Sequence, residues 1–596
     1  MRFIRKSLYT LLALILVLAI AVYFIAQTSY AARWVSQWVT DNTPYQLSLD
    51  HLDYSITSPY QLVLNDVEFS QQKQSPLLKA KKVTLELTSS FWQTPMYFSA
   101  LELEDGTLNL SSQNAIELAP GSDRFQLRNM TLNVDSPELS LQGEKVNGGI
   151  IPWTLTNSFL PEKDNRFEFS ADKLVVNGID THKILVQGEV KDHQILFNNV
   201  GADLANGQLT GNGKRTADGK WQIESLRLSE VKYQSPLELD QLLDQLNQRI
   251  SNTDISLNRL DLINTNIQGP EWAFSDFTLS MKDLEFIKGR WQATSGSALM
   301  NASDMIYNDN HLVSPVLSLE LENNSIKIKQ FSSRWQDGLV RATGNWQRDT
   351  QTLTLDDVAF TALLYTLPKD WLAQLKQVQP EWLRELHITK LAANRNILID
   401  ITPDFPFQFT SIDSNGSNLY LVKNRQVGLW GGTLSFNASD ATLNKIDLRH
   451  PSFTLNATPE TITISDISAF TKEGLIEANA TLSQQPERAL SLTLNGRSVP
   501  VDILQSWGWQ AIPLQGNGTI ALQLNGDLID KQSGKPELKG SLKMTSDTGQ
   551  QLTQYPAGQK AIPEEPQAIT PEPIIDPPVA PAPPSEQDAP EASPFG

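Results

Sequence analysis

The residue types that usually carry enzyme chemistry occur in this chain, but not in catalytic or metal-binding patterns. No HExxH motif, P-loop or G-x-S-x-G nucleophile elbow occurs. The adjacent carboxylates Asp356 and Asp357 would point to opposite faces of a strand, which does not favour paired-carboxylate catalysis. The six histidines are scattered, without metal-ligand spacing; they are His51, His182, His193, His311, His387 and His450. We therefore expect no enzyme, no catalytic residue, no metal and no cofactor.

Two more specialised chemistries are also disfavoured. The chain contains no cysteine, which excludes a disulfide framework, a thiol nucleophile and a cysteine-based zinc or iron–sulfur site. Gly516 to Ala521 nominally fits the dinucleotide fingerprint G-x-G-x-x-A. That fingerprint requires a following helix, whereas Leu522-Gln523-Leu524 continues as a strand pattern, so we do not expect a nucleotide site there.

The charge balance bears on the class of partner. Among 596 residues there are 48 Lys and Arg against 67 Asp and Glu, a formal net charge of −19. Phosphate binding needs clustered basic side chains, and no block of basic residues follows the first few residues of the chain. Nucleic acid is therefore not expected as a partner. The same balance disfavours electrostatic docking of the body on anionic lipid. Hydrophobic residues make up 40% of the chain, enough to build a sizeable apolar interior.

The N-terminus predicts a membrane anchor. Residues 1–7 carry three basic side chains, and the uncharged segment 8–26 follows them. As a helix, this segment would span about 28 Å, close to the thickness of a bilayer's hydrocarbon core. The positive-inside rule then keeps the N-terminus cytoplasmic and exports the rest. The residues expected to contact lipid tails are Leu8, Leu12, Leu16, Ile20 and Phe24.

A cleaved signal peptide is the alternative interpretation of this segment. Small residues occur near a plausible cleavage site at Ser29-Tyr30-Ala31, although no clean A-x-A motif is present. The apolar run is longer than the usual signal-peptide core, which favours the anchor. Either alternative exports the body.

Residues 27–44 predict a juxtamembrane amphipathic helix. Ala31, Trp34, Val35, Trp38 and Val39 fall on one helical face, and Pro44 follows shortly after them. We expect Trp34 and Trp38 to lie at the level of the lipid headgroups. Packing of this helix on the first strands of the body is an alternative, and the two are compatible.

The body alternates between apolar and polar residues, which predicts half-buried strands. Asp105-Gly106 has the composition of a hairpin turn between two such strands, and Asn-Gly pairs such as Asn147-Gly148, Asn177-Gly178 and Asn206-Gly207 suggest further turns. One apolar face should therefore run through the sheet. The residues we expect to line it include Leu85, Leu87, Leu101, Leu103, Leu108 and Leu110.

Two helical segments interrupt the strands. Residues 236–250 place four leucines on one face, and the Trp-rich residues 369–386 form a second amphipathic pattern, broken at Pro380. We expect both to cap ends or edges of sheet, with partner binding as an alternative for the second. The second segment divides the body into an N-terminal region, 45–368, and a C-terminal region, 387–546. Residues 547–596 are rich in proline and acidic residues and predict a disordered tail, either a solvated extension or a spacer or docking segment.

The order of these features resembles the AsmA family of Gram-negative inner-membrane proteins, and within it the YicH-type members. The resemblance covers the anchor and most of the body, to about Leu528, but not the proline-rich tail. The segments that carry it are YQLVLNDVEF (Tyr60–Phe69), LELEDGTLNLS (Leu101–Ser111), VNGGIIPW (Val146–Trp153), VGADLANGQLTGNGKRTADGKWQIESLRL (Val200–Leu228) and LNGRSVPVDILQSWGWQAIPLQGNGTIALQLNGDL (Leu494–Leu528).

The resemblance implies a fold and a function. The fold would be mainly β, with an elongated, curved antiparallel β-groove (a "β-taco") following the transmembrane helix. The function would be support of phospholipid transfer and outer-membrane homeostasis by an inner-membrane protein whose bulk is periplasmic. The alternative is a scaffold that regulates protein targeting to, or assembly in, the membrane, with an envelope protein as partner and no lipid carriage. A closed, packed core without a ligand is the third alternative for the apolar face.

Overall fold

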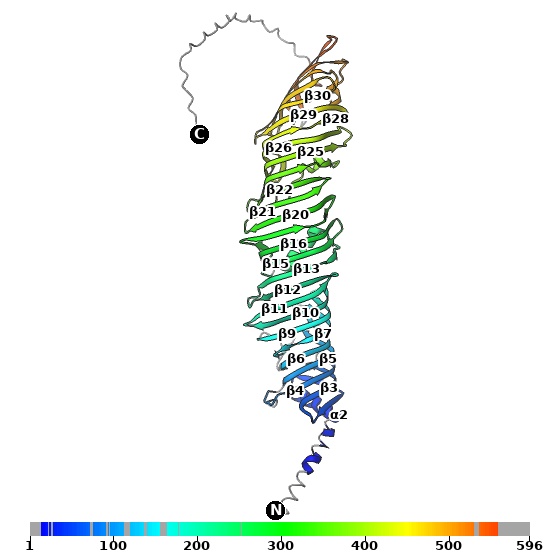
Figure 1. Cartoon of the computed structure of the whole chain (residues 1–596), viewed down its shortest axis with the longest axis vertical. Coiled ribbons are helices and arrows are strands. Elements are labelled where there is room, and N and C mark those ends of the chain that lie inside the picture. Colours follow the sequence, from blue (N-terminus) through cyan, green and yellow to red (C-terminus); the bar gives the residue numbers. More distant parts are fainter. Residues whose placement is uncertain are drawn as a thin grey trace, which may run out of the picture.

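The body of the protein is a long rod of stacked β-strands (Figure 1). This computed structural model describes residues 13–18, 20–21, 23–25, 28–71, 75–90, 93–94, 96–111, 120–135, 140–154, 164–176, 178–251, 253–529 and 536–557. Strands make up 68% of the structure and helices 9%, which confirms the expectation of a mainly β protein. The described strands join in one sheet of 35 strands.

The elements follow one another along the rod almost in chain order. The helices are α2 (Ser29–Asn42), α3 (Leu239–Ile250), α4 (Trp371–Gln374) and α5 (Ile503–Ser506). The strands of the first half are β1 (Tyr45–Ser48), β2 (His51–Ser55), β3 (Ser58–Gln71), β4 (Pro76–Leu87), β5 (Tyr97–Ser111), β6 (Gly121–Asp135), β7 (Ser140–Ile151), β8 (Trp153–Thr154), β9 (Asn165–Val176), β10 (Ile179–Lys191), β11 (Gln194–Leu204), β12 (Gly207–Arg215), β13 (Trp221–Ser229), β14 (Lys232–Gln234), β15 (Ile255–Gln268), β16 (Trp272–Ile287), β17 (Arg290–Gln292), β18 (Gly296–Asn301) and β19 (Asp304–Tyr307). Those of the second half are β20 (Asn310–Glu322), β21 (Ser325–Trp335), β22 (Gly338–Gln347), β23 (Thr352–Thr361), β24 (Leu364–Thr366), β25 (Glu385–Asp400), β26 (Phe407–Lys423), β27 (Gln426–Asn437), β28 (Asp440–Leu443), β29 (Ile446–Ala457), β30 (Thr461–Phe470), β31 (Leu475–Ser483), β32 (Ala489–Pro500), β33 (Asn517–Asp527), β34 (Glu537–Ser546) and β35 (Gln551–Gln554).

Strand pairing is antiparallel except at three junctions. β5 pairs parallel with β6, β13 and β14 pair parallel with β15, and β23 and β24 pair parallel with β25. The prediction of an antiparallel sheet is therefore confirmed for most of the rod, with these parallel junctions as exceptions that it did not include. Parallel neighbours need a connection that returns to the starting edge of the sheet, and the helical patterns of the sequence lie in two of these connections.

The hairpin predicted at Asp105-Gly106 does not form. Both residues lie inside the single strand β5, where Asp105 adopts a left-handed conformation (φ 55°). Asn147-Gly148 likewise lies inside β7. At Asn206-Gly207 the expected turn does join β11 to β12, and Asn177 lies outside the described residues. Turns and β-bulges both favour residues that tolerate positive φ, so the local sequence alone does not separate them.

Left-handed residues recur within the long strands, and a side chain of a neighbouring strand often accepts their backbone N–H. Asn129 (φ 50°) donates its amide to Oδ1 of Asn147 at 2.9 Å. Arg395 (φ 54°) donates its amide to Oδ1 of Asp413 at 3.0 Å. Because a bulge bends its strand, these positions let long strands curve without leaving backbone groups unpaired.

The two predicted helices differ in outcome. Residues 236–250 contain α3, as expected. Residues 369–386 contain only the four-residue α4, followed by turns up to the start of β25 at Glu385, so the prediction of a helix over that whole segment is wrong. The sheet also continues across this segment, because β23 pairs directly with β25. Pro380, which already broke the pattern, cannot continue a helix.

At the level of α3, its contacts with both ends of one strand show that the sheet bends into a U there. Near its start, the carbonyl of Leu237 accepts a hydrogen bond from Nε1 of Trp272, the first residue of β16. Beyond its end, Ser251 lies against Gly289, just past the last residue of β16. The 16 residues of β16 have a contour of about 50 Å, whereas the 12-residue helix is about 18 Å long. The strand must therefore bend so that α3 bridges its two ends.

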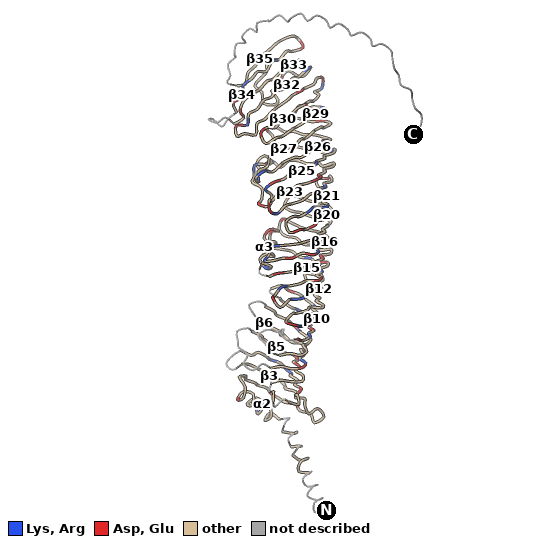
Figure 2. The backbone as a smooth tube through the Cα atoms, turned by 90° about the vertical axis from the view of Figure 1, so that its left-hand side faces the viewer, with Lys and Arg blue, Asp and Glu red and all other residues tan. Residues whose placement is uncertain are grey.

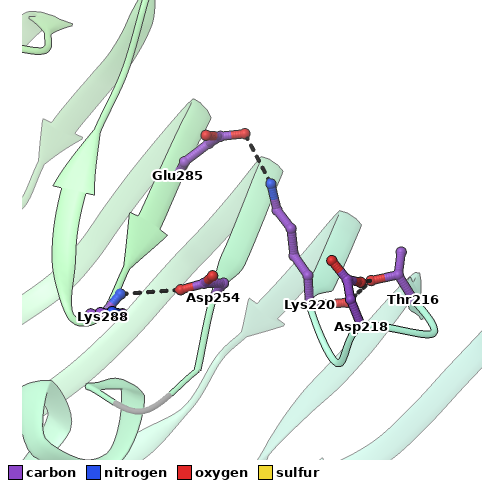
Figure 3. Close-up of polar contacts among 6 residues, drawn as sticks. All are labelled: Thr216, Asp218, Lys220, Asp254, Glu285 and Lys288. Carbon is purple, nitrogen blue, oxygen red and sulfur yellow. Dashed lines mark hydrogen bonds and ion pairs between the residues drawn. The ribbon is translucent and has the colours of Figure 1, made fainter.

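The edge at which α3 ends is fixed by polar contacts (Figure 3). The amide of Lys288 donates to Oδ1 of Asp254 at 3.2 Å, and Nζ of Lys220 lies 3.3 Å from Oε1 of Glu285. Figure 2 shows α3 at the border of the rod, and charged residues spread along the length of the rod.

We call residues 235–254 the α3 crossover and residues 367–384 the α4 crossover.

The α4 crossover repeats this arrangement higher in the rod. It begins where Nε1 of Trp371 donates to Oδ2 of Asp400 at 3.1 Å, close to the start of β26. It then reaches Arg425, just past the end of β26, whose carbonyl accepts the amide of Gln379 at 2.9 Å. Both crossovers thus pass from one end of a long curved strand to the other.

The largest buried clusters lie at the two ends of the rod. One involves β2–β10, and the other involves β28–β34 together with α5. At the second end, residues 501–514 fold over the sheet and bury Val501, Ile503 and Leu514. β35 extends the sheet to Gln554, beyond the predicted start of the tail at residue 547, and residues 558–596 lie outside the described part of the chain.

Candidate functional site

An apolar cavity of about 340 Å³ lies at the N-terminal end of the rod. One wall is the apolar face of α2, and the other is formed by β1, β3, β4, β5, β6 and β8 with their adjoining loops. No lining side chain carries an ionisable group. The cavity therefore offers dispersion contacts and an apolar solvent, and no group for acid–base chemistry.

The helix wall follows directly from the sequence pattern. The repeat of apolar residues puts Val35 and Val39 on the side of α2 that meets the strands, where Val39 is buried. The helix ends where the hydroxyl of Thr43 donates to the carbonyl of Val39 at 2.6 Å, just before Pro44. Trp34 and Trp38, expected at the headgroup level, both line the cavity, and Trp34 is 64% exposed.

All six leucines predicted to line the apolar face lie on the strand wall of this cavity. Leu85 and Leu87 come from β4, and the other four come from β5. Leu103 is 2% exposed, with Val83 opposite it on one side and Leu127 on the other. The alternation of β4 and β5 brings them together because the two strands pair in a register that keeps apolar residues opposite one another.

Other residues of the cavity wall are not among those predicted from the sequence. Phe125 and Trp153 stack with ring centroids 4.1 Å apart and are 1% and 5% exposed. They reach the cavity through the parallel pairing of β5 with β6, which strand alternation does not reveal. Leu62 and Leu64 lie in the alternating stretch Tyr60–Phe69 and could have been selected by the same rule as the six leucines.

The wall continues as a row of residues along the rod. From Leu52 on β2 to Leu419 on β26, each member lies opposite the next on the neighbouring strand, and each is apolar or glycine. We call this row the apolar strip; it consists of Leu52, Leu64, Val83, Leu103, Leu127, Gly148, Phe169, Val186, Val200, Gly211, Leu226, Leu260, Met281, Ala298, Leu319, Ile328, Gly344, Leu355, Ile388 and Leu419.

Burial changes along the apolar strip. Its first five members, from Leu52 to Leu127, are at most 4% exposed. Its larger members in the middle of the rod are only half-buried; they are Phe169, Val186, Val200, Leu226, Leu260, Met281, Leu319, Ile328 and Leu355. At Ile388 and Leu419 burial is nearly complete again. The sheet therefore keeps an apolar face through the middle of the rod that the protein's own side chains cover only in part.

Charged residues near the cavity occupy the opposite face of the sheet. Nζ of Lys82 lies 2.9 Å from Oε2 of Glu104, and Arg128 pairs with Glu102. These residues are chain neighbours of strip residues, so alternation turns them away from the cavity. At one end of the cavity wall, the hydroxyl of Tyr97 donates to Oδ1 of Asp123 at 2.7 Å, and this hydrogen bond raises the pKa of Tyr97.

The remaining predicted site residues belong to the predicted anchor. Leu8 and Leu12 lie outside the described residues. Leu16, Ile20 and Phe24 are 59%, 44% and 63% exposed. Within the described residues, no single helix has the length and apolar composition to cross a bilayer; Ala13–Ile25 and Ser29–Asn42 reach them only as a pair, bent by 78°. In the same residues, no group of three or more His, Asp and Glu side chains could hold a metal ion.

Comparison with known proteins gives one close relative. The chain is 40% identical over 554 residues to the AsmA family protein YicH of Escherichia coli strain K12, covering 93% of this chain and 97% of the relative. No family model matches the chain. No solved structure matches it significantly.

Proposed function

The chain belongs to the AsmA family, and from this premise we propose that it is a non-enzymatic, inner-membrane-anchored periplasmic protein that carries phospholipid along its apolar strip and so supports outer-membrane homeostasis. Acyl chains would lie on the strip, while headgroups stay in water at the open side of the U. No catalytic group is needed for such carriage, because the work is done by continuous apolar contact.

The observation that carries the proposal is the half-buried middle of the apolar strip. A row of residues such as Leu260 and Leu319 loses about 25 cal/mol of stabilisation for each Å² of apolar surface left in water. A sheet that only packed its own core would bury this face, as it does at Leu103. The strip is also continuous with the apolar cavity beneath α2, which offers lipid a place to enter near the membrane.

The anchor predicted from the sequence is consistent with the same proposal. The uncharged segment 8–26 precedes α2 directly, so the cavity would lie close to the outer surface of the inner membrane. Trp34, exposed at the cavity wall, suits the headgroup region of a bilayer.

Lipid co-purification tests this function. The detergent-extracted full chain should carry phospholipid detectable by mass spectrometry, and Leu85→Asp should remove much of it, because a carboxylate in the cavity wall disfavours acyl chains. Thr84→Asp is the matched control, since Thr84 is the preceding residue of β4 and faces the other side of the sheet. A wild-type chain free of lipid, or equal loss in the two variants, would contradict the proposal.

A second function, a scaffold that regulates protein targeting or assembly, rests on the α4 crossover. Leu372, Leu375, Val378 and Trp382 are each 47–64% exposed there, and exposed apolar clusters often bind proteins. The combined Leu372→Glu, Leu375→Glu and Val378→Glu variant would then abolish the protein's effect on the cell envelope, while the amount of bound phospholipid stays unchanged. If the variant lost both its bound phospholipid and its effect on the envelope, lipid carriage would be favoured instead.

A further inference from the structure

The α3 crossover presents an apolar helix face that the protein does not bury. Leu239, Leu242, Leu243 and Leu246 share one side of α3, yet α3 has no buried residue. Leu243 and Leu246 are 54% and 52% exposed, whereas Leu239 and Leu242 are half-buried. A 12-residue amphipathic helix normally owes its stability to packing of such a face, so this face is incomplete as it stands.

The ends of α3 are nevertheless held in place. Its first turn has a capping box, in which Glu238 and Gln241 satisfy each other's backbone amides. The carbonyl of Leu237 accepts a hydrogen bond from Nε1 of Trp272 at one edge of the U, and Ser251 lies against Gly289 at the other edge. The helix is thus fixed across the mouth of the sheet and not free to move away from it.

The apolar strip passes through the same part of the rod. Leu226, Leu260 and Met281 are its members on β13, β15 and β16, the strands joined and bridged by the α3 crossover. All three are only half-buried. Two apolar surfaces, the strip and the leucine face, therefore lie at one level of the U without burying each other.

We propose that the leucine face of α3 and the strip residues Leu226, Leu260 and Met281 together form a second binding site, for the acyl chain of a lipid. This inference rests on the proposed function and adds a specific lipid-binding site to it. An acyl chain lying between the two surfaces would remove both from water at once. The exposed polar side of α3, with Gln245 and Gln248, would remain in solvent.

The chemistry of the site favours an acyl chain over a peptide. β13, β15 and β16 are paired with neighbours along their length, so they present no free edge to which an extended peptide could add as a strand. The strip offers neither charge nor hydrogen-bonding side chain at this level, so an occupant gains only apolar contact. The strip also runs without interruption from this site to the cavity beneath α2, which supplies the same kind of ligand.

Site-specific fluorescence on the full chain tests the proposal, and the absence of native cysteine allows clean labelling. Leu246→Cys and Gln248→Cys, on opposite sides of α3, would each carry an environment-sensitive dye, and Leu62→Cys would report on the cavity. Dioctanoylphosphatidylcholine below its critical micelle concentration is the probe. We expect a blue shift of emission at positions 246 and 62, and none at 248.

The outcomes separate the two proposals. A response at 62 without one at 246 would overturn the α3 site and leave the proposed function standing. If the emission shifts at neither position 246 nor position 62, both the α3 site and the proposed function would be overturned. Equal responses at 246 and 248 would indicate non-specific adsorption on the helix and would also overturn the site.

A second measurement removes dependence on the label. The combined Leu243→Glu and Leu246→Glu variant changes two exposed side chains, so the fold and melting temperature should stay unchanged. Native mass spectrometry should then show fewer bound lipids per chain than in wild type, with the lipid-dependent response at position 62 retained. An unchanged number of bound lipids would contradict the site.

Discussion

Nε1 of Trp371 donates a hydrogen bond to Oδ2 of Asp400 at 3.1 Å, and this bond fastens the start of the α4 crossover to the end of β25. The other carboxylate oxygen of Asp400 accepts both the hydroxyl and the amide of Thr402. These bonds, with that of the Thr402 hydroxyl the largest, hold the pKa of Asp400 below its ordinary value. One carboxylate therefore joins a crossover, a strand and a loop.

Asp400→Asn should loosen the α4 crossover without unfolding the rod, because the amide is a weaker acceptor than the carboxylate. Trypsin should then cleave faster after Lys376, which lies in the crossover, while the melting temperature of the body changes little. Asp404→Asn, in the exposed loop nearby, should leave cleavage at the wild-type rate. Unaltered cleavage in Asp400→Asn would show that this bond does not hold the crossover.

Asp261 should make stability dependent on acid pH. This buried carboxylate lies 2.7 Å from Nε of Arg259 and accepts the hydroxyl of Ser280 at 2.8 Å. Burial by itself raises the pKa of Asp261, but the bonds from Arg259 and Ser280 outweigh it, so the pKa lies below its ordinary value. The stabilisation is thus present above about pH 4, the unfolded pKa, and is lost as pH falls through the folded pKa.

Asp261→Asn should lower the free energy of unfolding by roughly 1–3 kcal/mol at pH 7, measured by urea denaturation. The difference from wild type should shrink below about pH 4. Asp218→Asn is the control: its pKa is also lowered, chiefly by the hydroxyl of Thr216, but it lies in an exposed turn (Figure 3). That variant should stay close to wild type, and a larger effect at Asp218 than at Asp261 would contradict this account.

Truncation of the strip should cost different amounts at its end and in its middle. Leu103→Ala removes a side chain that is 2% exposed and should cost about 2–5 kcal/mol. Leu319→Ala removes a half-buried side chain and should cost about 1 kcal/mol in lipid-free protein, since less contact is lost. Equal costs would show that the middle of the strip is packed as tightly as the end.

The bulge at Asn129 should discriminate between side chains. Its left-handed backbone (φ 50°) tolerates Asn and Gly, whereas a β-branched residue is strained there. Asn129→Val should therefore destabilise the body by roughly 1–3 kcal/mol. Asn129→Gly should cost less, because it keeps the backbone conformation and loses only the exposed hydrogen bond from Nδ2 of Asn129 to Oδ1 of Asp105. Thr131→Val, two residues further along β6, is the control and should be tolerated. Equal melting temperatures for the Asn129→Val and Thr131→Val variants would argue against strain at the bulge.

Alternation was sufficient to select the cavity leucines but not to define the sheet. Leu85 and Leu103 could be assigned to one face because side chains alternate along each regular stretch of strand, whatever its partner. The left-handed residue Asp105 shifts this alternation by one position within β5, so that Leu108 and Leu110 face the same side as Leu101 and Leu103. The parallel junction that adds Phe125 depends on a connection through residues 112–119, which has no local signature in the sequence. Strand neighbours are a tertiary property, and the sequence of one strand does not specify them.

The errors at Asp105-Gly106 and at 369–386 have related causes. Left-handed backbone occurs in turns and in bulges alike, so the Asp105-Gly106 pair predicts a turn that the strand does not make. The amphipathic pattern around Trp371 predicts a helix, but contacts to Asp400 and Arg425 hold most of that segment in turns. In both cases the surrounding sheet overrides a local preference.

The near-sequential order of the strands also has a kinetic consequence. Since almost every strand pairs with the one that precedes it in the chain, as β21 does with β20, each addition closes only a short loop and loses little chain entropy. Folding can then advance like a zipper from the N-terminal end, in the order in which the chain emerges. The junction between β13 and β15 is different, because the whole α3 crossover must form before β15 can pair in parallel with β13. We expect the slow steps of assembly to fall at such junctions, where a pause would leave a strand edge exposed.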